Sequence, residues 1–507
     1  MTVGNPVSRM HRALSSPWRV GAPMLALALL AFSACSGEPD LCANGPCGEG
    51  GVDGQVSGDG TFPETGILDT KPDAPIPVGC ETPNEPLKNP EKCLTDVFGV
   101  FVSPTGDDGG PGTKASPFKT IGKALTGSAP RIVVCEGSYT ESVDVNRDVE
   151  LYSGVDCAFS KVGGKAKIVA VKPDYAVGIV KPASAVRIAD FEVEAVDGTA
   201  ASVNSVGIVA AEVASVKLVG VSVTAKKGFD GAVGAGGATG TVSNLAAIGG
   251  TVNGYPATAS TTPGGLKTCA CTIGGNTTGG GGGATAGNGQ DGAPPVVGFG
   301  KAGLGGVSCG AGGLGGDGSP TVAALAAPKQ TTIGLLESGN WKGSAGLSGD
   351  DGKSGQGGGG GGGRDGSSAG GGGGCGGCGG SGGKGGGGAG GSIAILSNAS
   401  SVTLEKCTLT AGTGGAGGAG GTGGGGGPGG NGGIGGCSGG EGGLGGGGGA
   451  GGGGAGGIAY AIVYKGTKPT RSGTTATGGT AGKGGTNGAG VTDHGPVGTS
   501  GEELEAP

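Results

Sequence analysis

Val186-Arg-Ile-Ala-Asp-Phe-Glu-Val-Glu-Ala195 decides the fold, because the chain contains this pattern three times. The other copies run from Val216 to Ala225 and from Val402 to Ala411. Each copy holds two short apolar/polar alternations separated by two residues, which predicts two strands. A third apolar run precedes each copy. These runs are Val177–Val180, Val206–Val209 and Ile393–Leu396. The pattern therefore predicts three strands per repeat.

The alternation also assigns the faces of the predicted strands. Successive side chains point to opposite faces, so the apolar residues of 186–193 line one interior, whereas Arg187, Glu192 and Glu194 face water. A unit this thin cannot bury its own apolar face, and stacking unit on unit supplies the missing surface. We therefore predict an all-β fold, a right-handed parallel β-helix with one coil per repeat.

Glycine dominates the rest of the chain. Of 507 residues 136 are Gly and only 3% are aromatic, so much of the chain is held by backbone contacts or is not held at all. Gly-rich insertions at 226–391 and 412–456 leave the predicted coils at equivalent turns, which places both on one edge of the β-helix. A coil at 392–411 lies between them. A final strand at 457–465 and a loose Gly/Thr-rich tail at 466–507 are expected to follow.

The second Gly-rich insertion has a three-residue period. Its non-Gly residues include Thr413, Ala416, Ala419, Thr422, Pro428, Asn431, Ile434 and Cys437. This is the period of the polyproline-II helix, and Gly on the other two edges lets neighbouring backbones approach closely. An ordered bundle and a disordered linker both remain open. They differ at Cys375 and Cys378, which lie about 9 Å apart in a polyproline-II helix, too far for a mutual disulfide. A bundle would pair them with neighbouring strands, where Cys437, Cys309, Cys269 and Cys271 are the candidates.

The N-terminus has the pattern of an export signal. Three Arg precede a short apolar run that ends in Ser33-Ala34-Cys35. This run is too short to span a bilayer. Small residues before a Cys resemble a bacterial lipobox, which implies a signal peptide at 1–34, lipidation of Cys35 and a lipidated flexible stalk at 35–95. Ser36 resembles the signal that forwards lipoproteins to the Gram-negative outer membrane.

The structured part is expected to begin near Val97. The stretch VFVSPTGDDGGPGTKASPFKTIGKAL, residues 100–125, leads through IVVCEGSYTESVDV to VELYSG at 149–154. Together with the coils to 225, it resembles secreted and surface β-helix proteins of the pectate-lyase-like class. That resemblance implies a helix that caps the first coil. Ser116 as N-cap and Pro117 as first helical residue predict a helix that ends near Leu125.

Fourteen Cys in an exported chain predict disulfides. The expected local pairs are Cys42 with Cys47 and Cys80 with Cys93 in the stalk, and Cys135 with Cys157 in the first coils. Lipidation of Cys35 would leave an odd number, so one Cys is free or intermolecular.

Few residues have the pattern of a catalytic or metal site. The only His residues, His11 and His494, lie near the two ends, which removes His-based triads and metal clusters, and no cofactor is expected. The weak catalytic candidates are Asp190, Glu192 and Glu194. Enzymes of the resembled class that cut polysaccharides place carboxylates on such a face. The equivalent positions of the other copies, however, include Ser222, Thr224, Thr408 and Thr410.

Charge and composition limit the partners. Three of the 32 basic residues and none of the 39 acidic residues lie within 1–34, so the remainder carries a net charge of about −10, which disfavours nucleic acid. We expect a membrane partner through the lipid anchor, and extracellular polysaccharide or other surface proteins. The leading interpretation is a non-catalytic structural or adhesive lipoprotein of the outer membrane surface. The alternatives are a polysaccharide lyase or hydrolase, and a Gly-rich ice- or surface-binding protein.

Overall fold

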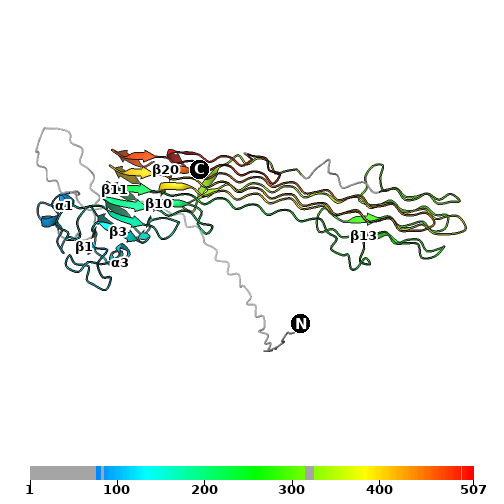
Figure 1. Ribbon diagram of the computed structural model, residues 1–507, viewed down its shortest axis with the longest axis horizontal. Coiled ribbons are helices and arrows are strands. Elements are labelled where there is room, and N and C mark those ends of the chain that lie inside the picture. Colours follow the sequence, from blue (N-terminus) through cyan, green and yellow to red (C-terminus); the bar gives the residue numbers. More distant parts are fainter. Residues whose placement is uncertain (1–75, 81–84, 315–324, 493) are drawn as a thin grey trace, which may run out of the picture. The chain divides into compact units, whose positions relative to one another are not determined.

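The computed structural model describes residues 76–80, 85–314, 325–492 and 494–507 (Figure 1). These residues belong to one compact unit. The predicted signal peptide, Cys35 and the pair Cys42/Cys47 lie outside the described residues.

Most strands belong to three parallel sheets, which confirms the right-handed parallel β-helix. Sheet A contains β1 (Val100–Val102), β2 (Arg131–Val134), β5 (Val149–Tyr152), β8 (Ala185–Ala189), β11 (Ser215–Val219), β18 (Val402–Glu405) and β21 (Thr470–Ser472). Sheet B contains β3 (Gly137–Thr140), β6 (Ala166–Val169), β9 (Phe191–Glu194), β12 (Ser222–Thr224), β19 (Thr408–Thr410) and β22 (Thr475–Thr477). Sheet C contains β4 (Val143–Val145), β7 (Val177–Val180), β10 (Ser205–Ala211), β17 (Ser392–Asn398), β20 (Ala459–Lys465) and β23 (Ser500–Glu505).

The sequence repeat is the structural coil. Leu218 pairs with Ile188 on one side and with Leu404 on the other, in the register that the repeat predicts. These side chains belong to a single buried core inside the β-helix. One assignment was wrong: Arg187 is buried rather than water-facing. It lies in the ladder between Glu150 and Lys217, and these long side chains shield it.

A short helix closes the N-terminal end, as predicted, but it begins later. Helix α3 (Ile121–Leu125) has Thr120 as its N-cap, whose hydroxyl accepts from the Lys123 N–H at 3.1 Å. The Glu141 carboxylate accepts from the N–H groups of Ile121 and Gly122 at 2.9 and 2.8 Å. Phe118 is not helical, because its backbone pairs with Val102 beside β1. The buried side of α3 packs on the end of the core.

Two segments cover the outer faces of sheets A and C. The described end of the predicted stalk is folded: α1 (Glu85–Lys88) and α2 (Pro90–Cys93) lead to Leu94 and Phe98, which are buried with outward-facing residues of sheet A. The hairpin of β15 (Gly334–Glu337) and β16 (Asn340–Gly343) places Trp341 against the outer side of sheet C. Among the described residues no such apolar cover lies on the outer face of sheet B.

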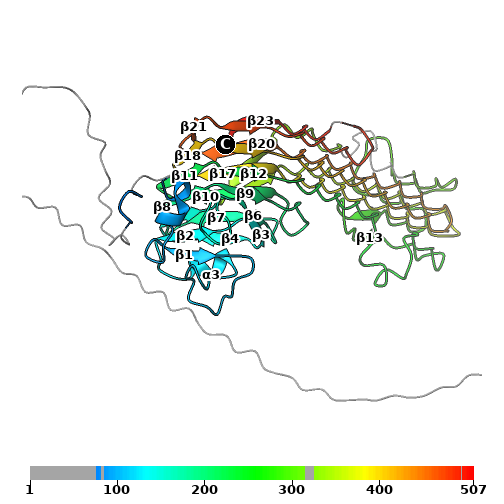
Figure 2. The same cartoon turned by 60° about the vertical axis from the view of Figure 1, so that its left-hand side comes forward.

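The described residues of the Gly-rich insertions are ordered, which is the first of the two alternatives that the sequence left open. Residues 369–390 form a central Gly strand, and every residue from 369 to 380 is buried. Every third N–H donates to one neighbouring strand, as in Gly377 to Gly443 and Gly383 to Gly449, at 2.8 and 2.9 Å. Residues 344–361, 412–436 and 229–240 are further neighbours. The three-residue period matches the polyproline-II prediction. The extended strands of this Gly bundle are the long parallel traces in Figures 1 and 2.

All excursions leave the β-helix at the turn from sheet B to sheet C, as predicted from the sequence. They follow β12 and β19, with shorter ones after β9 and β22. The prediction of a loose tail was wrong. Strands β21, β22 and β23 pair with β18, β19 and β20, so β20 is not the last strand. Residues 479–488 join the Gly bundle, where Gly485 donates to Gly454 at 2.9 Å.

Five disulfides cross-link the described residues. Two join the expected neighbours, Cys80 with Cys93 and Cys135 with Cys157. Cys375 and Cys378 are not bonded to each other; each pairs with a cysteine of the hairpin formed by β13 (Lys267–Cys269) and β14 (Thr277–Gly279) or the residues beside it. The three pairs in the Gly bundle are Cys269–Cys375, Cys271–Cys378 and Cys309–Cys437. The one free cysteine of the described residues is Cys407.

Candidate functional site

The three acidic candidates do not form a shared catalytic site. Asp190 lies in the turn between β8 and β9 with φ of 62°, where burial raises the pKa of its carboxyl. Its carboxylate lies over Gly220, where any side chain would collide with it, so its environment is that of a coil turn. Glu192 is exposed on β9. Asp190 and Glu192 therefore have different environments.

Glu194 is held by two lysines. Its carboxylate oxygens lie 2.5 Å from Lys167 Nζ and 2.7 Å from Lys226 Nζ. Hydrogen bonds from these lysines hold the pKa of Glu194 below its ordinary value. A carboxylate so paired is a poor proton acceptor and a weak nucleophile. In the described part of the chain, no group of three or more His, Cys, Asp or Glu residues is arranged to hold a metal ion.

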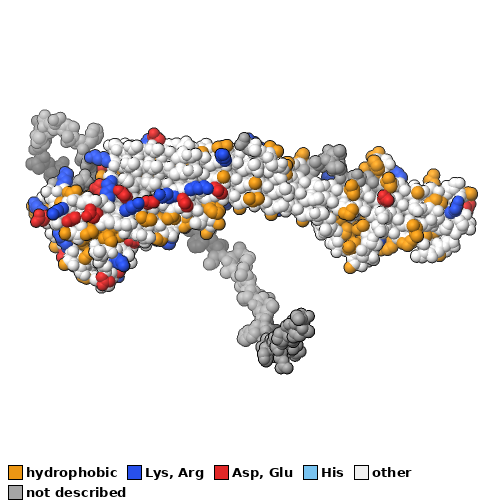
Figure 3. Space-filling model, viewed as in Figure 1, with side chains coloured by type: hydrophobic (Ala, Val, Ile, Leu, Met, Phe, Trp, Pro, Cys, Tyr) orange, Lys and Arg blue, Asp and Glu red, His pale blue; other side chains and the backbone are white. Residues whose placement is uncertain are grey.

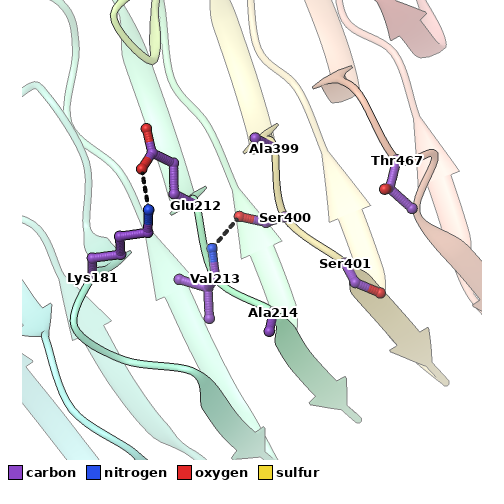
Figure 4. A pocket seen from close by; sticks show the side chains of 8 residues that line it. All are labelled: Lys181, Glu212, Val213, Ala214, Ala399, Ser400, Ser401 and Thr467. Carbon is purple, nitrogen blue, oxygen red and sulfur yellow. Dashed lines mark hydrogen bonds and ion pairs between the residues drawn. The ribbon is translucent and has the colours of Figure 1, made fainter. Parts of the chain in front are cut away.

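A shallow groove crosses the turns from sheet C to sheet A (Figure 4). Its lining consists of Lys181, Glu212, Val213, Ala214, Ala399, Ser400, Ser401 and Thr467. Lys181 Nζ and a Glu212 carboxylate oxygen lie 2.7 Å apart and offset each other's charge. The Ser400 hydroxyl accepts from the Val213 N–H at 3.0 Å and stabilises the turn. These two contacts hold the turns that form the groove.

The outer face of sheet B carries rows of hydroxyl side chains in its last three coils. Ser222 pairs with Thr408, and Thr408 with Thr475; Thr224, Thr410 and Thr477 form the second row. A third row follows where the strands enter the Gly bundle, because Thr413 bridges to Thr480. We call these residues the Thr face: Ser222, Thr224, Thr408, Thr410, Thr413, Thr475, Thr477 and Thr480.

The Thr face points to solvent and is unpaired. All eight residues are exposed or partly exposed. None of their hydroxyls has a hydrogen bond to another described residue, although hydroxyls elsewhere do, such as Thr470 to Thr403 at 3.3 Å. The same two rows hold Lys167, Glu192 and Glu194 in the earlier coils. Figure 3 shows a row of alternating charges on the β-helix beside a broad area with neither charged nor hydrophobic side chains.

The sequence contained a signal for these rows. Ser222-Val-Thr, Thr408-Leu-Thr and Thr475-Ala-Thr share one alternation. The first two were recognised only as positions that lack carboxylates. The third lies in the segment 466–507, for which the sequence predicts a loose tail.

Cys407 is the one free thiol among the described residues. Burial raises the pKa of its thiol, and its Sγ lies 3.4 Å from the Leu218 carbonyl oxygen inside the core. A buried neutral thiol behaves as a small apolar side chain.

None of the described helices has the length and hydropathy to cross a membrane.

Comparison with known families gives one match. Residues 104–279, about a third of the chain, match a family model described as a protein of unknown function (DUF1565). The matched region covers the coils from β2 to β12 and the start of the first Gly-rich insertion. This match fits a β-helix. The chain matches no curated protein and no solved structure.

Proposed function

We propose that this chain is a non-catalytic structural or adhesive protein of the cell surface, held at the outer membrane through a lipidated Cys35. The observation that carries the proposal is the way in which the β-helix and the Gly bundle are connected. The sheet B strands continue directly into the Gly bundle, so the β-helix holds a hydrogen-bonded arm. Five disulfides support an oxidising compartment. Extracellular polysaccharides and other surface proteins are the proposed partners.

The lipid anchor on Cys35 and the localisation at the outer membrane are tested separately in a Gram-negative host. Wild-type protein is expected to incorporate labelled palmitate, to fractionate with the outer membrane and to be cleaved by protease added to intact cells. Cys35→Ser removes the sulfur that carries the lipid, so the label and the membrane fraction are lost. Ser36→Asp keeps the label and moves the protein away from the outer membrane. Equal labelling of wild type and Cys35→Ser, or full protection from external protease, would refute the proposal.

The second candidate function is a polysaccharide lyase or hydrolase that acts on sheet B. Its single supporting observation is the exposed Glu192 beside Glu194 on one strand. Assay of the full chain on acidic polysaccharides decides it, with Glu192→Gln as the test variant. Glu212→Gln, in an exposed ion pair at a turn, is the matched control. If wild type and Glu212→Gln turn over the polysaccharide and Glu192→Gln does not, the protein is an enzyme and the structural proposal is refuted.

A further inference from the structure

We infer that the Thr face is a binding site for ice, and that it adsorbs the protein to the surface of ice crystals. The inference rests on the proposed function only in treating the chain as a binding scaffold without catalysis. It assigns the contact to the outer side of β12, β19 and β22 and to the bridge between Thr413 and Thr480.

The Thr face repeats at fixed distances in two directions. Parallel strands of a sheet lie about 4.8 Å apart, and residues two apart on a strand are separated by about 6.6 Å. The ladder Thr224, Thr410, Thr477 follows the first direction, and Thr408 with Thr410 follows the second. A periodic array of this kind fits a ligand that is itself periodic and flat. Two hollows among the described residues lie elsewhere, at the turns and on the Gly bundle, whereas the array itself is flat.

The chemistry of the array favours water over sugar. Each Thr presents one hydroxyl and one methyl group, and the hydroxyls have no described protein partner. The hydroxyls are therefore free to bind water molecules at fixed spacing. The methyl groups beside them limit the other orientations of these water molecules. None of the eight residues is aromatic, so no ring is available to stack on sugars, and none is charged. The strands are fixed by the stacked core before contact, so little ordering entropy opposes binding.

The uncharged surface continues onto the Gly bundle. Residues 413–422 lie between residues 228–237 and 480–486, joined by hydrogen bonds such as Gly231 to Ala416 and Gly417 to Lys483. The exposed or partly exposed side chains of the middle strand are Thr413, Ala416, Ala419 and Thr422. Hydroxyl and methyl groups thus extend past the β-helix. The Lys227–Asp230 pair and Lys483 are the charges that border this strand.

The test is adsorption of the purified full chain to ice, with thermal hysteresis and inhibition of recrystallisation as readouts. Thr410 lies at the centre of the face, between Thr224 and Thr477. Thr410→Tyr raises a bulky ring above the plane, and we expect activity to fall about tenfold or more, as when the centre of an interface is blocked. Thr410→Val keeps the shape without the hydroxyl and is expected to lose less. Thr467→Tyr is the matched control, because Thr467 is exposed at a turn on another edge (Figure 4).

Circular dichroism and melting of each variant verify the fold. Ice activity in wild type and Thr467→Tyr that is lost in Thr410→Tyr would support the inference. Inactive wild type, undiminished activity in Thr410→Tyr, or adsorption to crystalline cellulose or chitin but not to ice would overturn it. The readouts do not depend on Cys35, so a failure here leaves the labelling and fractionation results standing, and the reverse also holds.

Discussion

The β-helix and the Gly bundle are built by opposite means. In the β-helix, strands are spaced by side chains, and a continuous apolar core runs through the coils. In the Gly bundle the buried centre is backbone, held by hydrogen bonds at every third residue. A bundle that buries so little apolar surface must satisfy its buried polar groups almost completely. The comparison teaches that one chain can extend a fold by replacing side-chain packing with backbone packing.

The largest expected effect concerns the cross-links of the Gly bundle. Cys269–Cys375 and Cys271–Cys378 close nearly the same loop, with separations of 106 and 107 residues. Removing either pair by Cys→Ala leaves the loop closed by the other. Removing both opens a loop whose closure is worth about 4.7 kcal/mol in the chain-entropy model.

We therefore expect the double removal to cost far more than the sum of the two single removals. Hydrogen exchange read by mass spectrometry should show the loss in residues 369–390 and not in β8. The control is removal of Cys135–Cys157, which spans 22 residues in the β-helix and is expected to affect the first coils. Additive effects of the two single removals would contradict the shared-loop model.

The second prediction probes the side-chain core. Ile188→Ala opens a cavity in the column between Leu151 and Leu218 and should cost about 2–5 kcal/mol. Ile434→Ala is the control in the Gly bundle. Its side chain is 74% exposed, so the expected change is within about 0.5 kcal/mol. Denaturant unfolding followed by regional hydrogen exchange measures both, and equal costs would mean that the Gly bundle also depends on its side chains.

The two regions differ in how well the sequence predicted them. The coils were predictable because apolar residues of β8, β11 and β18 recur at period two and in register. Strands β21 and β22 were missed because Thr470-Arg-Ser and Thr475-Ala-Thr carry no bulky apolar residues. Backbone pairing with β18 and β19 holds these two strands in place, although their own sequence has no apolar pattern.

Order in the Gly bundle was left open for a physical reason. Gly carries no side-chain pattern, and the hydrogen bonds that order it come from strands as distant as 229–240 and 437–455. The cysteine geometry nevertheless predicted that Cys375 and Cys378 pair with neighbouring strands. Of the four candidates, Cys269 and Cys271 are their partners, whereas Cys309 and Cys437 are bonded to each other. The acidic candidates followed from strand alternation, but their ion pairs, such as Glu194 with Lys226, depend on which coil lies next to which.

The third prediction tests backbone packing directly. A Cβ added at Gly379 would lie 1.9 Å from the Gly352 carbonyl oxygen, so the two strands must separate. Gly379→Ala should cost about 3 kcal/mol, at the upper end of overpacking effects. At Gly447 the nearest atom to an added Cβ is 3.4 Å away. Gly447→Ala should be neutral or stabilising by up to about 1 kcal/mol, because Ala restricts the unfolded chain. Thermal melting compares the pair, and an equal effect would contradict close backbone contact.

The smallest expected effect is a pH-dependent change in stability that concerns the β-helix and not the Gly bundle. The pKa of Glu194 is lowered from 4.5 in the folded protein by the hydrogen bonds from Lys167 and Lys226. A depressed carboxyl pKa stabilises the folded state above the unfolded pKa, and this stability is lost as the pH falls through the folded pKa. The contribution is at most about 1 kcal/mol, because such exposed ion pairs are screened by solvent.

Glu194→Gln should therefore lower the stability of the β-helix coils at pH 7 and have no effect well below the folded pKa of Glu194. The difference between wild type and variant isolates this group from Asp190, whose raised pKa acts in the opposite sense as the pH rises. Residues 369–380 contain no ionisable side chain other than disulfide-bonded Cys375 and Cys378, so hydrogen exchange there, corrected for its intrinsic pH dependence, should be the same in both proteins. A pH-dependent difference between the proteins in those residues would show that the Gly bundle draws its stability from the charged coils rather than from its own backbone.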